Sequence, residues 1–497
     1  MLRALSVNPL RVSLIAFAAW ASSPAQAALQ ISSAPTSNVA CSSGVCTATA
    51  KAAVLNVADL ANMLSSGDVT VASGRMARDI EIKAKLSWTS ASRLTLDSHR
   101  SIAFEKPIIV AGTGALIITT GDGGQSGDFA FAKNGHVEFR DTNSGLIING
   151  ATYILAKSIK EISAAVAGDP DSNIALTHSI HAPEHPYFRS LVDNEFSGNF
   201  EGLGNTISGL TIKVIGIPGD QNVGLFSEYD AEGSPGNSIR DIGLTDVNIT
   251  GGNSNQSIGG LVGLLVASTV KNAYVTGTIS SSGSGSFVGG LVGFHQLSVI
   301  NNSYADVDIS STGANSMIGG LVGEAEDACT CYVISQSYAT GTVSAGDNAM
   351  VGGFVGKNTG NKFSNTYATG SVTGGNGAFV GGFVGMNMNP SPPQSIATIL
   401  SSYSVGAVSG GSGATVGGFI GSDASGTVNT DAYWNLDTSG ISDPSRGAGN
   451  ISNDPGITGL TTTQLTSGLP AGFDPSIWKQ NASINGGYPY LAVLPPN

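Results

Sequence analysis

The sequence predicts an all-β protein built as a parallel β-solenoid, a chain that coils into a stack of similar turns. Three observations support this fold class. A six-residue glycine motif of the type VGGLVG recurs at nearly even intervals, a tyrosine recurs in step with it, and the segments between them are typical of strands rather than helices. Such a fixed period is the signature of a repeat architecture.

The glycine motif occurs six times, and its first residues are separated by 30, 30, 33, 29 and 36 positions. Its copies are Ile258–Gly263, Val288–Gly293, Ile318–Gly323, Val351–Gly356, Val380–Gly385 and Val416–Gly421. The second marker is formed by Tyr274, Tyr304, Tyr338, Tyr367, Tyr403 and Tyr433, which follow small or polar pairs such as NA, NS, QS and NT. Two wider intervals contain the insertions EDACTC and MNPSPPQS. The repeat unit is therefore about 30 residues long.

Segments such as YVTGTIS, YADVDIS and YATGTVS alternate with period two and are rich in Thr and Val, which indicates strands. A helix would lose about 1 kcal/mol at each glycine. Thirty extended residues trace roughly 100 Å, which suits one circuit of a prism with three short strands. Each strand then pairs in parallel with its equivalent in the next circuit, about 4.8 Å away.

Within each coil, the branched and long apolar residues of the glycine motif are expected to point inward. The motif glycines are expected to supply positive φ at corners and to allow close approach of backbones. The tyrosines are expected to stack from coil to coil as an aromatic ladder. The glycines are thus assigned an architectural role rather than a phosphate-binding one.

The two ends differ from the regular array. Residues 28–215 are interpreted as an N-terminal β-helical region, the lower part of the same solenoid with circuits of roughly 20–25 residues, and Ser158–Gly168 as its one helical excursion. Residues 216–440 form the regular array. Residues 441–497 are predicted to form a C-terminal cap, with Trp478 and Tyr488 over the last open rung, because an uncovered edge invites association.

The N-terminus is typical of an export signal. Arg3 and Arg11 precede the apolar run Leu14–Trp20, and Ala25–Ala27 has the small-x-small form of a cleavage site. Residues 1–27 are therefore predicted to be a signal peptide, and the mature chain is expected outside the cytoplasm.

The four cysteines suit an oxidising compartment. Cys41 and Cys46 bracket a short loop and are predicted to form a disulfide. Cys329 and Cys331 are separated by one residue, and either a strained disulfide or two free thiols is consistent with that spacing. Neither pair has the spacing of a zinc site, so no metal or cofactor is predicted.

The charge balance argues against nucleic acid as a partner. The net charge is −13, and only 11% of the residues are charged. Between Arg240 and Arg446 the only basic residues apart from histidine are Lys271, Lys357 and Lys362. A nucleic-acid surface needs a basic stripe to neutralise phosphates, and this chain has none.

Several phrases resemble known families. The GGLVG motifs, the SYATGTV strands, YWNLDTSG at Tyr433–Gly440 and the ending W…GYPYL are similar to those of bacterial GLUG-repeat proteins. The segment DIEIKAKLSW…LTLDSHRSIAF…IIVAGTGALIITT resembles the β-helical part of filamentous-haemagglutinin-type adhesins. Together these resemblances cover nearly all of the mature chain. They imply a right-handed parallel β-helix in an exported surface protein that attaches to cells, matrix or surfaces. An outer-membrane transporter is a candidate partner for its export.

The main alternative is a β-helical polysaccharide lyase or glycoside hydrolase. Asp306 and Asp308 lie two residues apart on one predicted strand, which places their carboxylates on the same side, roughly 6–7 Å apart. His295 belongs to the same repeat. The equivalent positions of the adjacent coils hold threonines, however, so no further acid, Arg or Lys joins the pair. No catalytic residue is therefore assigned.

A second alternative is an ice-binding solenoid. It rests on a hydroxyl array formed by Thr276, Thr278, Thr340, Thr342, Thr369 and Ser371. Asp306 and Asp308 interrupt this array, and threonine is also a good strand former.

The sequence therefore predicts a secreted or surface-displayed bacterial adhesin-like structural protein without catalytic activity. Its expected partners are host-cell, matrix or polysaccharide surfaces. The insertions at Glu324–Cys331 and Met386–Ser395 are the most individual features of the array and are predicted to be contact loops.

Overall fold

The structure is a computed structural model of the whole chain. It describes residues 27–124, 126–216, 222–234, 236–327, 333–391, 395–427 and 429–496. The predicted signal peptide, except for its last residue, lies outside the described residues, as do Cys329 and Cys331.

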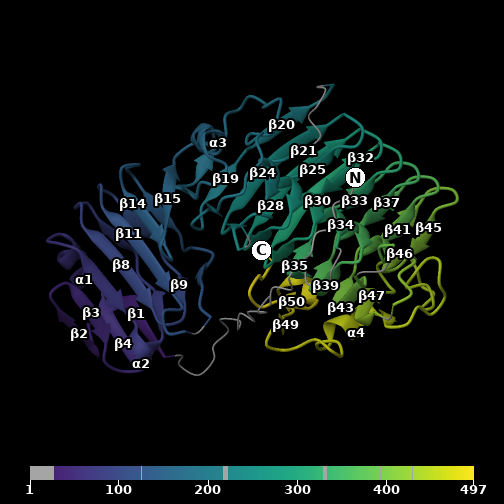
Figure 1. Cartoon of the computed structure of the whole chain (residues 1–497). Helices are drawn as coiled ribbons and strands as arrows, with labels where there is room; N and C mark the ends of the chain where they lie inside the picture. The colour runs from purple at the N-terminus through teal and green to yellow at the C-terminus, as the bar shows by residue number, and fades with distance from the viewer. Residues whose placement is uncertain are drawn as a thin grey trace.

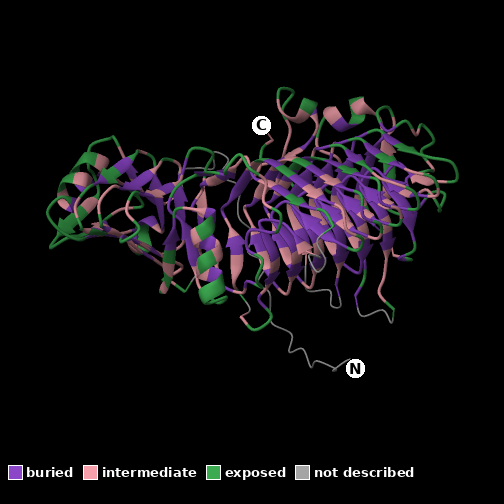
Figure 2. Cartoon of the chain, turned by 90° about the horizontal axis from the view of Figure 1, so that it is seen from above, coloured by how far each residue is buried: buried purple, intermediate pink, exposed green. Residues whose placement is uncertain are grey.

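The molecule consists of two stacks of short β-strands that meet at an angle (Figure 1). Each stack has its own apolar core. The first core extends from Leu29 to Leu155 and also receives Ala175 and Leu203, and the second extends from Ala156 to Ala448. Figure 2 shows buried strands along the interior of both stacks, with exposed residues mainly on loops and on helix α3 (Ile159–Gly168).

The first stack contains three sheets with mainly parallel pairing. Equivalent leucines Leu94, Leu116 and Leu146 pair in register, so these coils advance by 22 and 30 residues. Its strands are β1 (Ala28–Ser32), β2 (Val39–Ser42), β3 (Val45–Ala48), β4 (Ala52–Asn56), β5 (Val69–Ala72), β6 (Asp79–Ile82), β7 (Leu86–Trp88), β8 (Arg93–Ser98), β9 (Ile102–Phe104), β10 (Ile108–Val110), β11 (Ala115–Thr120), β12 (Phe129–Phe131), β13 (Val137–Phe139) and β14 (Gly145–Ile148).

The hairpin β2–β3 and two short helices, α1 (Val57–Leu64) and α2 (Gly74–Ala77), close the N-terminal end of this stack. Helix α1 begins after Asn56, whose side chain accepts hydrogen bonds from two backbone N–H groups of the first turn. It buries Leu60 and Leu64 against the first core. In the hairpin, Cys41 and Cys46 form a disulfide.

The expectation of one continuous solenoid is wrong. Strand β15 (Ala151–Ala156) pairs antiparallel with β14, and the chain then resumes parallel pairing with β16 (Ile174–Leu176). This reversal ends the first stack and starts the second. The predicted helix is confirmed as α3, which lies at this junction and begins after Ser158, whose side chain caps Glu161 N. The apolar core therefore changes near residue 155, whereas the predicted boundary at 215 rests on the absence of the glycine motif before the regular array.

The second stack contains two seven-stranded sheets formed by the glycine motifs and one broad sheet. Motif sheet 1 consists of β21 (Asn222–Val223), β25 (Ser257–Gly259), β29 (Phe287–Gly289), β33 (Met317–Gly319), β37 (Met350–Gly352), β41 (Phe379–Gly381) and β45 (Thr415–Gly417). Motif sheet 2 consists of β22 (Phe226–Asp230), β26 (Val262–Val266), β30 (Val292–Gln296), β34 (Val322–Glu326), β38 (Val355–Thr359), β42 (Val384–Met388) and β46 (Ile420–Asp423).

The broad sheet takes two strands from most coils, and its pairing within this stack is parallel. Its strands are β16, β17 (Ile180–His181), β18 (Phe200–Glu201), β19 (Thr206–Ser208), β20 (Thr211–Val214), β23 (Ser238–Arg240), β24 (Gly243–Gly251), β27 (Thr269–Lys271), β28 (Tyr274–Ser281), β31 (Val299–Asn301), β32 (Tyr304–Ser311), β35 (Val333–Ala339), β36 (Val343–Ser344), β39 (Lys362–Ala368), β40 (Val372–Gly374), β43 (Thr398–Ser404), β44 (Val408–Gly410), β47 (Thr430–Asn435) and β48 (Ile457–Leu460).

The motif glycines are needed for close packing, not for positive φ. The expectation that they supply positive φ at corners is wrong, because none of them has a positive φ. A Cβ on Gly289 would lie 2.0 Å from Val292 O and 2.7 Å from the Gly323 N of the next coil. Where motif sheets 1 and 2 meet, backbones of successive coils therefore approach so closely that no side chain fits.

Positive φ occurs instead at other corners of the coils. Two columns of such residues extend through six coils each. One column contains Asn255, Gly285, Asn315, Asn348, Gly377 and Gly413. The other contains Asn272, Asn302, Gln336, Asn365, Ser401 and Asp431, which stand two residues before the ladder tyrosines. Asn and Gly tolerate this conformation best, which explains why small polar pairs precede the tyrosines.

The tyrosine ladder is confirmed. Tyr274, Tyr304, Tyr338, Tyr367 and Tyr403 stack with ring centroids 4.7–5.1 Å apart, and Tyr433 continues their register. Tyr338, Tyr367, Tyr403 and Tyr433 lie outside the second core and form a separate cluster with the C-terminal segment, and Tyr304 packs against this cluster.

The C-terminal segment lies along the side of the stack rather than over its open end. Strand β48 pairs with β47 and completes a last coil. Helix α4 (Thr462–Thr466), strands β49 (Trp478–Lys479) and β50 (Tyr490–Leu491), and the 3₁₀ turn η1 (Asn485–Gly487) follow beside β39 and β43 (Figure 1). Trp478 contacts Tyr367 and Tyr403 and donates from Nε1 to Asn365 Oδ1 at 3.0 Å. Its predicted place over the last rung is therefore wrong.

Candidate functional site

The broad sheet presents a polar face to solvent. On β32, Asp306 and Asp308 are exposed and alternate with the buried side chains of Ala305, Val307 and Ile309. The two carboxylates therefore lie on the same side of the strand, as the period of two predicted. Thr276 and Thr278 are their register partners in the preceding coil.

Both carboxylates are hydrogen-bonded to the following coil. Thr340 Oγ1 donates to Asp306 Oδ1 at 2.8 Å. The backbone N and Oγ1 of Thr342 donate to Asp308 Oδ1 at 2.9 and 2.7 Å. Two members of the hydroxyl array, Thr340 and Thr342, are thus hydrogen-bonded to the acidic pair, and their hydroxyls are engaged in these contacts.

His295 is not brought to this pair. It lies on β30 of motif sheet 2, fully buried, in register with Leu265 of the preceding coil. Burial lowers its pKa to about 4, although backbone groups of His295 and Ser298 oppose the shift. The ring is therefore neutral at physiological pH and faces the interior rather than the acidic face.

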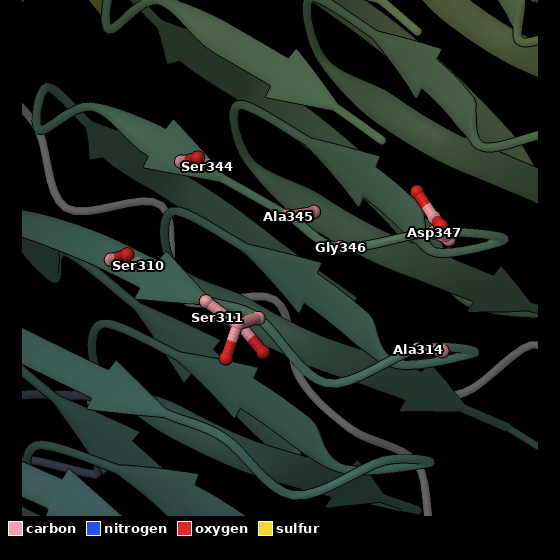
Figure 3. A pocket seen from close by; sticks show the side chains of 8 residues that line it. Ser310, Ser311, Ala314, Ser344, Ala345, Gly346 and Asp347 are labelled. Carbon is pink, nitrogen blue, oxygen red and sulfur yellow. The ribbon is translucent and has the colours of Figure 1, made fainter. Parts of the chain in front are cut away.

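A small notch borders the polar face where β32 and β36 end (Figure 3). Its volume is about 280 Å³, and it lies between Ser310, Ser311 and Thr312 of one coil and Ser344 and Asp347 of the next. The Asp347 carboxylate accepts a hydrogen bond from Asn376 N at 2.8 Å. Hydroxyls and one engaged carboxylate can bind the hydroxyl groups of a ligand, but they do not form a nucleophile–base pair.

The two insertions meet at one corner of the stack. Ser395 is buried and donates from Oγ to Asp327 O at 2.8 Å, although 68 positions separate them. Beside this contact, Ile396 is 51% exposed. Within the first insertion, Glu324 is largely buried and pairs with Lys357 Nζ at 2.7 Å. Part of the first insertion is therefore structural, while the described flank of the second reaches solvent.

Sequence reasoning missed a cluster of buried charges at the junction of the two stacks. Arg240 Nη1 pairs with Asp128 Oδ1 at 2.7 Å, and Arg240 Nη2 donates to Phe129 O at 2.7 Å. Its Nε pairs with Asp241 at 2.6 Å and with Glu201 at 3.5 Å. The guanidinium also lies 4.1 Å from the centre of the Phe129 ring.

The charges of this cluster attract the first stack to the second. Lys271 adds a second ion pair to Asp128. Burial raises the pKa of Asp128, but the charges of Arg240 and Lys271 outweigh it, so the pKa lies below its usual value. Burial and the charge of Asp241 raise the pKa of Glu201. The only sequence signal was that Arg240 precedes a long arginine-free stretch.

A second open hollow, of about 690 Å³, lies at the same junction. Glu138, Arg140 and Asp141 of the first stack line one side of it, and Lys157 and His178 of the second stack line the other. Arg140 pairs with Glu138 at 3.1 Å, so the hollow carries no strong excess of either charge.

The model of the GLUG motif matches residues 254–280 and 347–373. Each match spans one glycine motif and the ladder tyrosine that follows it. The chain thus carries the GLUG motif in two coils of the second stack.

No curated protein matches the chain. Among solved structures, a candidate immunoglobulin A1 protease from Bacteroides ovatus is similar at 16% identity, over 69% of this chain and 92% of the other. The TM-score is 0.40, which is too low to support an argument about fold or activity.

The described residues offer neither a membrane-spanning helix nor a metal-binding cluster. They contain no helix that is long and apolar enough to cross a membrane. They also contain no group of three or more His, Cys, Asp and Glu side chains arranged to hold a metal ion.

Proposed function

We propose that this protein is a secreted or surface-displayed adhesin-like structural protein that attaches to host cells, matrix or polysaccharide surfaces without catalysing a reaction. One observation carries the proposal. The acidic pair that could have been catalytic is bound to threonines of the next coil on an open sheet face, and His295 is buried elsewhere. A glycosidase pair needs one carboxyl group with a raised pKa in a site that excludes water.

Further support comes from architecture. We take the coils of about 30 residues to be right-handed, because parallel crossovers are right-handed in about 98% of cases. Such a stack presents long faces and corner loops, over which many weak contacts sum to useful affinity. The resemblance of the N-terminal region to filamentous-haemagglutinin-type adhesins agrees with this role, as does the predicted signal peptide with export through an outer-membrane transporter.

The contact surface is assigned to the insertion corner beside Ile396. A purified chain that starts at Ala28 is expected to bind a subset of immobilised matrix proteins or polysaccharides in surface plasmon resonance. Ile396→Asp should weaken this binding by roughly tenfold or more if the corner is central to the contact. Ile215→Asp is the matched control, because Ile215 is 50% exposed on another part of the second stack.

The same polysaccharides separate adhesion from catalysis. The native chain is expected to release neither reducing ends nor unsaturated products. Reproducible release that disappears in the variant Asp306→Asn would overturn the proposal in favour of a lyase or hydrolase. Inhibition of ice recrystallisation, lost in Thr342→Val, would instead support the ice-binding alternative, which the engaged threonine hydroxyls disfavour.

A further inference from the structure

The open hollow at the junction of the two stacks has a firm base. Its volume of about 690 Å³ falls within the range of about 300–1,000 Å³ that sites for small molecules occupy. Two of its lining residues are buried, Phe139 of the first stack with 2% exposure and Thr177 of the second with 1%. Phe139 N donates to Thr177 O at 2.7 Å, so a backbone hydrogen bond joins the stacks at the base of the hollow. The two walls are therefore held in place before a ligand binds.

The wall from the first stack combines hydrogen-bond donors and acceptors. Arg140 Nε pairs with Glu138 Oε1 at 3.1 Å. Asn143 donates to Asp141 Oδ1 from its backbone N at 2.9 Å and from Nδ2 at 2.8 Å, which holds the turn after β13. Among the described residues, the Nη atoms of Arg140 and the second oxygens of Glu138 and Asp141 have no hydrogen-bond partner. These atoms remain available to a ligand.

The opposite wall adds two exposed side chains, Lys157 and His178. The backbone of Lys157 is fixed, because its N donates to Glu161 Oε2 at 2.9 Å. Its Nζ lies 3.8 Å from Glu161 Oε1, which is too far for a direct hydrogen bond. His178 Nδ1 lies 2.8 Å from Thr177 Oγ1, and this contact orients the imidazole ring. The second wall therefore offers an ammonium group and an oriented ring.

The charges of the lining limit the class of ligand. The positive charges of Arg140 and Lys157 are balanced by the negative charges of Glu138 and Asp141. A polyphosphate would meet the two carboxylates, and a divalent cation would meet the two cationic side chains. A flat apolar ligand would find little apolar surface, because Phe139 is buried. The lining therefore suits an uncharged ligand that both donates and accepts hydrogen bonds.

We propose that this hollow binds a neutral sugar residue of a glycan. A hydroxyl group has one hydrogen to donate and two lone pairs to accept with. Neighbouring sugar hydroxyls can therefore accept from the Nη atoms of Arg140 and donate to the available oxygens of Glu138 and Asp141. Hydrogen bonds in which one partner is ionised are stronger than neutral ones. This inference rests on the proposed function, because it assigns a place to the polysaccharide partner.

The test is isothermal titration calorimetry of the chain that starts at Ala28. The probes are four soluble hexasaccharides, of β-1,4-glucose, α-1,4-glucose, β-1,4-xylose and α-1,6-mannose, each at up to about 10 mM. At least one is expected to bind at one site per chain. Arg140→Gln should weaken this binding by roughly tenfold or more, because the charged donors are lost. Arg75→Gln is the matched control, since Arg75 is exposed on α2 at the far end of the first stack.

Lys157→Gln tests the opposite wall and should also weaken binding. Both side chains are largely exposed, so both variants are expected to fold, and circular dichroism with thermal melting checks this. Absence of binding by all four probes would overturn the proposal. Binding that neither Arg140→Gln nor Lys157→Gln weakens would overturn it as well, because the sugar would then lie elsewhere.

The same chain separates this inference from the proposed function. Ile396→Asp, at the insertion corner, should leave the calorimetric titration unchanged while it weakens attachment to immobilised surfaces. Attachment of a chain that binds none of the four probes would overturn the sugar site alone. Binding of a probe by a chain that attaches to no surface would instead overturn the adhesive function and leave the sugar site standing.

Discussion

At several positions in this chain, the neighbouring coil limits the size of the side chain that fits. At Gly289 the next coil lies so close that a Cβ would overlap a backbone oxygen and a backbone nitrogen. At Gly285 the constraint is different, because φ is +69° and the Asn255 side chain of the preceding coil lies 2.5 Å from the position of a Cβ. Two glycines four positions apart thus serve different physical needs.

Gly289→Ala is expected to destabilise the second stack by about 2–4 kcal/mol, because the backbones must separate to admit the methyl group. Urea denaturation followed by circular dichroism measures the change. Gly233→Ala is the matched control, since a Cβ there meets nothing within 4 Å, and its midpoint should stay within experimental error. Equal stability of the two variants would contradict the close-packing account.

His295 makes the chain sensitive to acid. Its folded pKa of about 4 lies below the usual 6.5, so the folded state binds fewer protons than the unfolded state between these values. Stability is therefore expected to fall as pH drops from about 6.5 to 4, by about 3 kcal/mol in all.

His295→Leu should remove this pH dependence, because Leu265 already occupies the equivalent position in the preceding coil. Denaturation curves at several pH values between 4 and 7 measure the effect. His181→Leu is the matched control for the loss of a histidine, because the His181 side chain is exposed. An unchanged pH dependence in His295→Leu would contradict a buried neutral imidazole.

Among the elements, the tyrosine ladder and the C-terminal segment form one structural unit. The rings stack on one another along the stack, and the segment seals the later ones from solvent. Tyr403 is tied to the segment, since its OH donates to Pro489 O at 2.5 Å and accepts from Asn485 Nδ2 at 2.7 Å. Tyr367, one rung earlier, is equally buried, but its OH has no partner among the described residues.

These two rungs are expected to respond in opposite ways to loss of the hydroxyl. Tyr403→Phe should lower stability by about 1–3 kcal/mol, because Pro489 O and Asn485 lose a buried partner. Tyr367→Phe should be neutral or stabilising, because it removes an unsatisfied polar atom. Limited proteolysis of the C-terminal segment together with thermal melting measures both effects. A larger loss in Tyr367→Phe than in Tyr403→Phe would contradict the assigned hydrogen bonds.

At the scale of the whole molecule, two stacks with separate cores are joined by a reversal at β14–β15 and by the charges around Arg240. The cluster connects residues that are more than a hundred positions apart, such as Asp128 and Arg240. Because most of each core is contributed by residues of its own stack, this junction decides whether the two stacks unfold together.

Arg240→Met is expected to uncouple the two stacks. It leaves Asp128, Glu201 and Asp241 buried with less compensation, at a cost of about 3–5 kcal/mol. Differential scanning calorimetry should then show two transitions in place of one, with the stacks as separate units. Arg140→Gln is the control, because Arg140 is largely exposed and pairs with one neighbour in the open hollow. A single unshifted transition in Arg240→Met would contradict the proposal that the charge cluster couples the unfolding of the two stacks.

The sequence alone determined the repeat. The spacing of the glycine motif and of the tyrosines predicted parallel coils, inward apolar residues and a stacked ladder, because these features depend on contacts between equivalent residues that a period reveals. It likewise predicted that Asp306 and Asp308 share one side of a strand, since strand geometry fixes this locally.

Only the tertiary structure decided how non-equivalent parts meet. The reversal between the stacks, the lateral position of Trp478, the burial of His295 and the ion pair of Arg240 with Asp128 all depend on which segments lie side by side across long separations. The conformational propensities of single residues do not specify such long-range contacts. They follow from the free energy of packing whole faces together, to which each residue contributes only a small part.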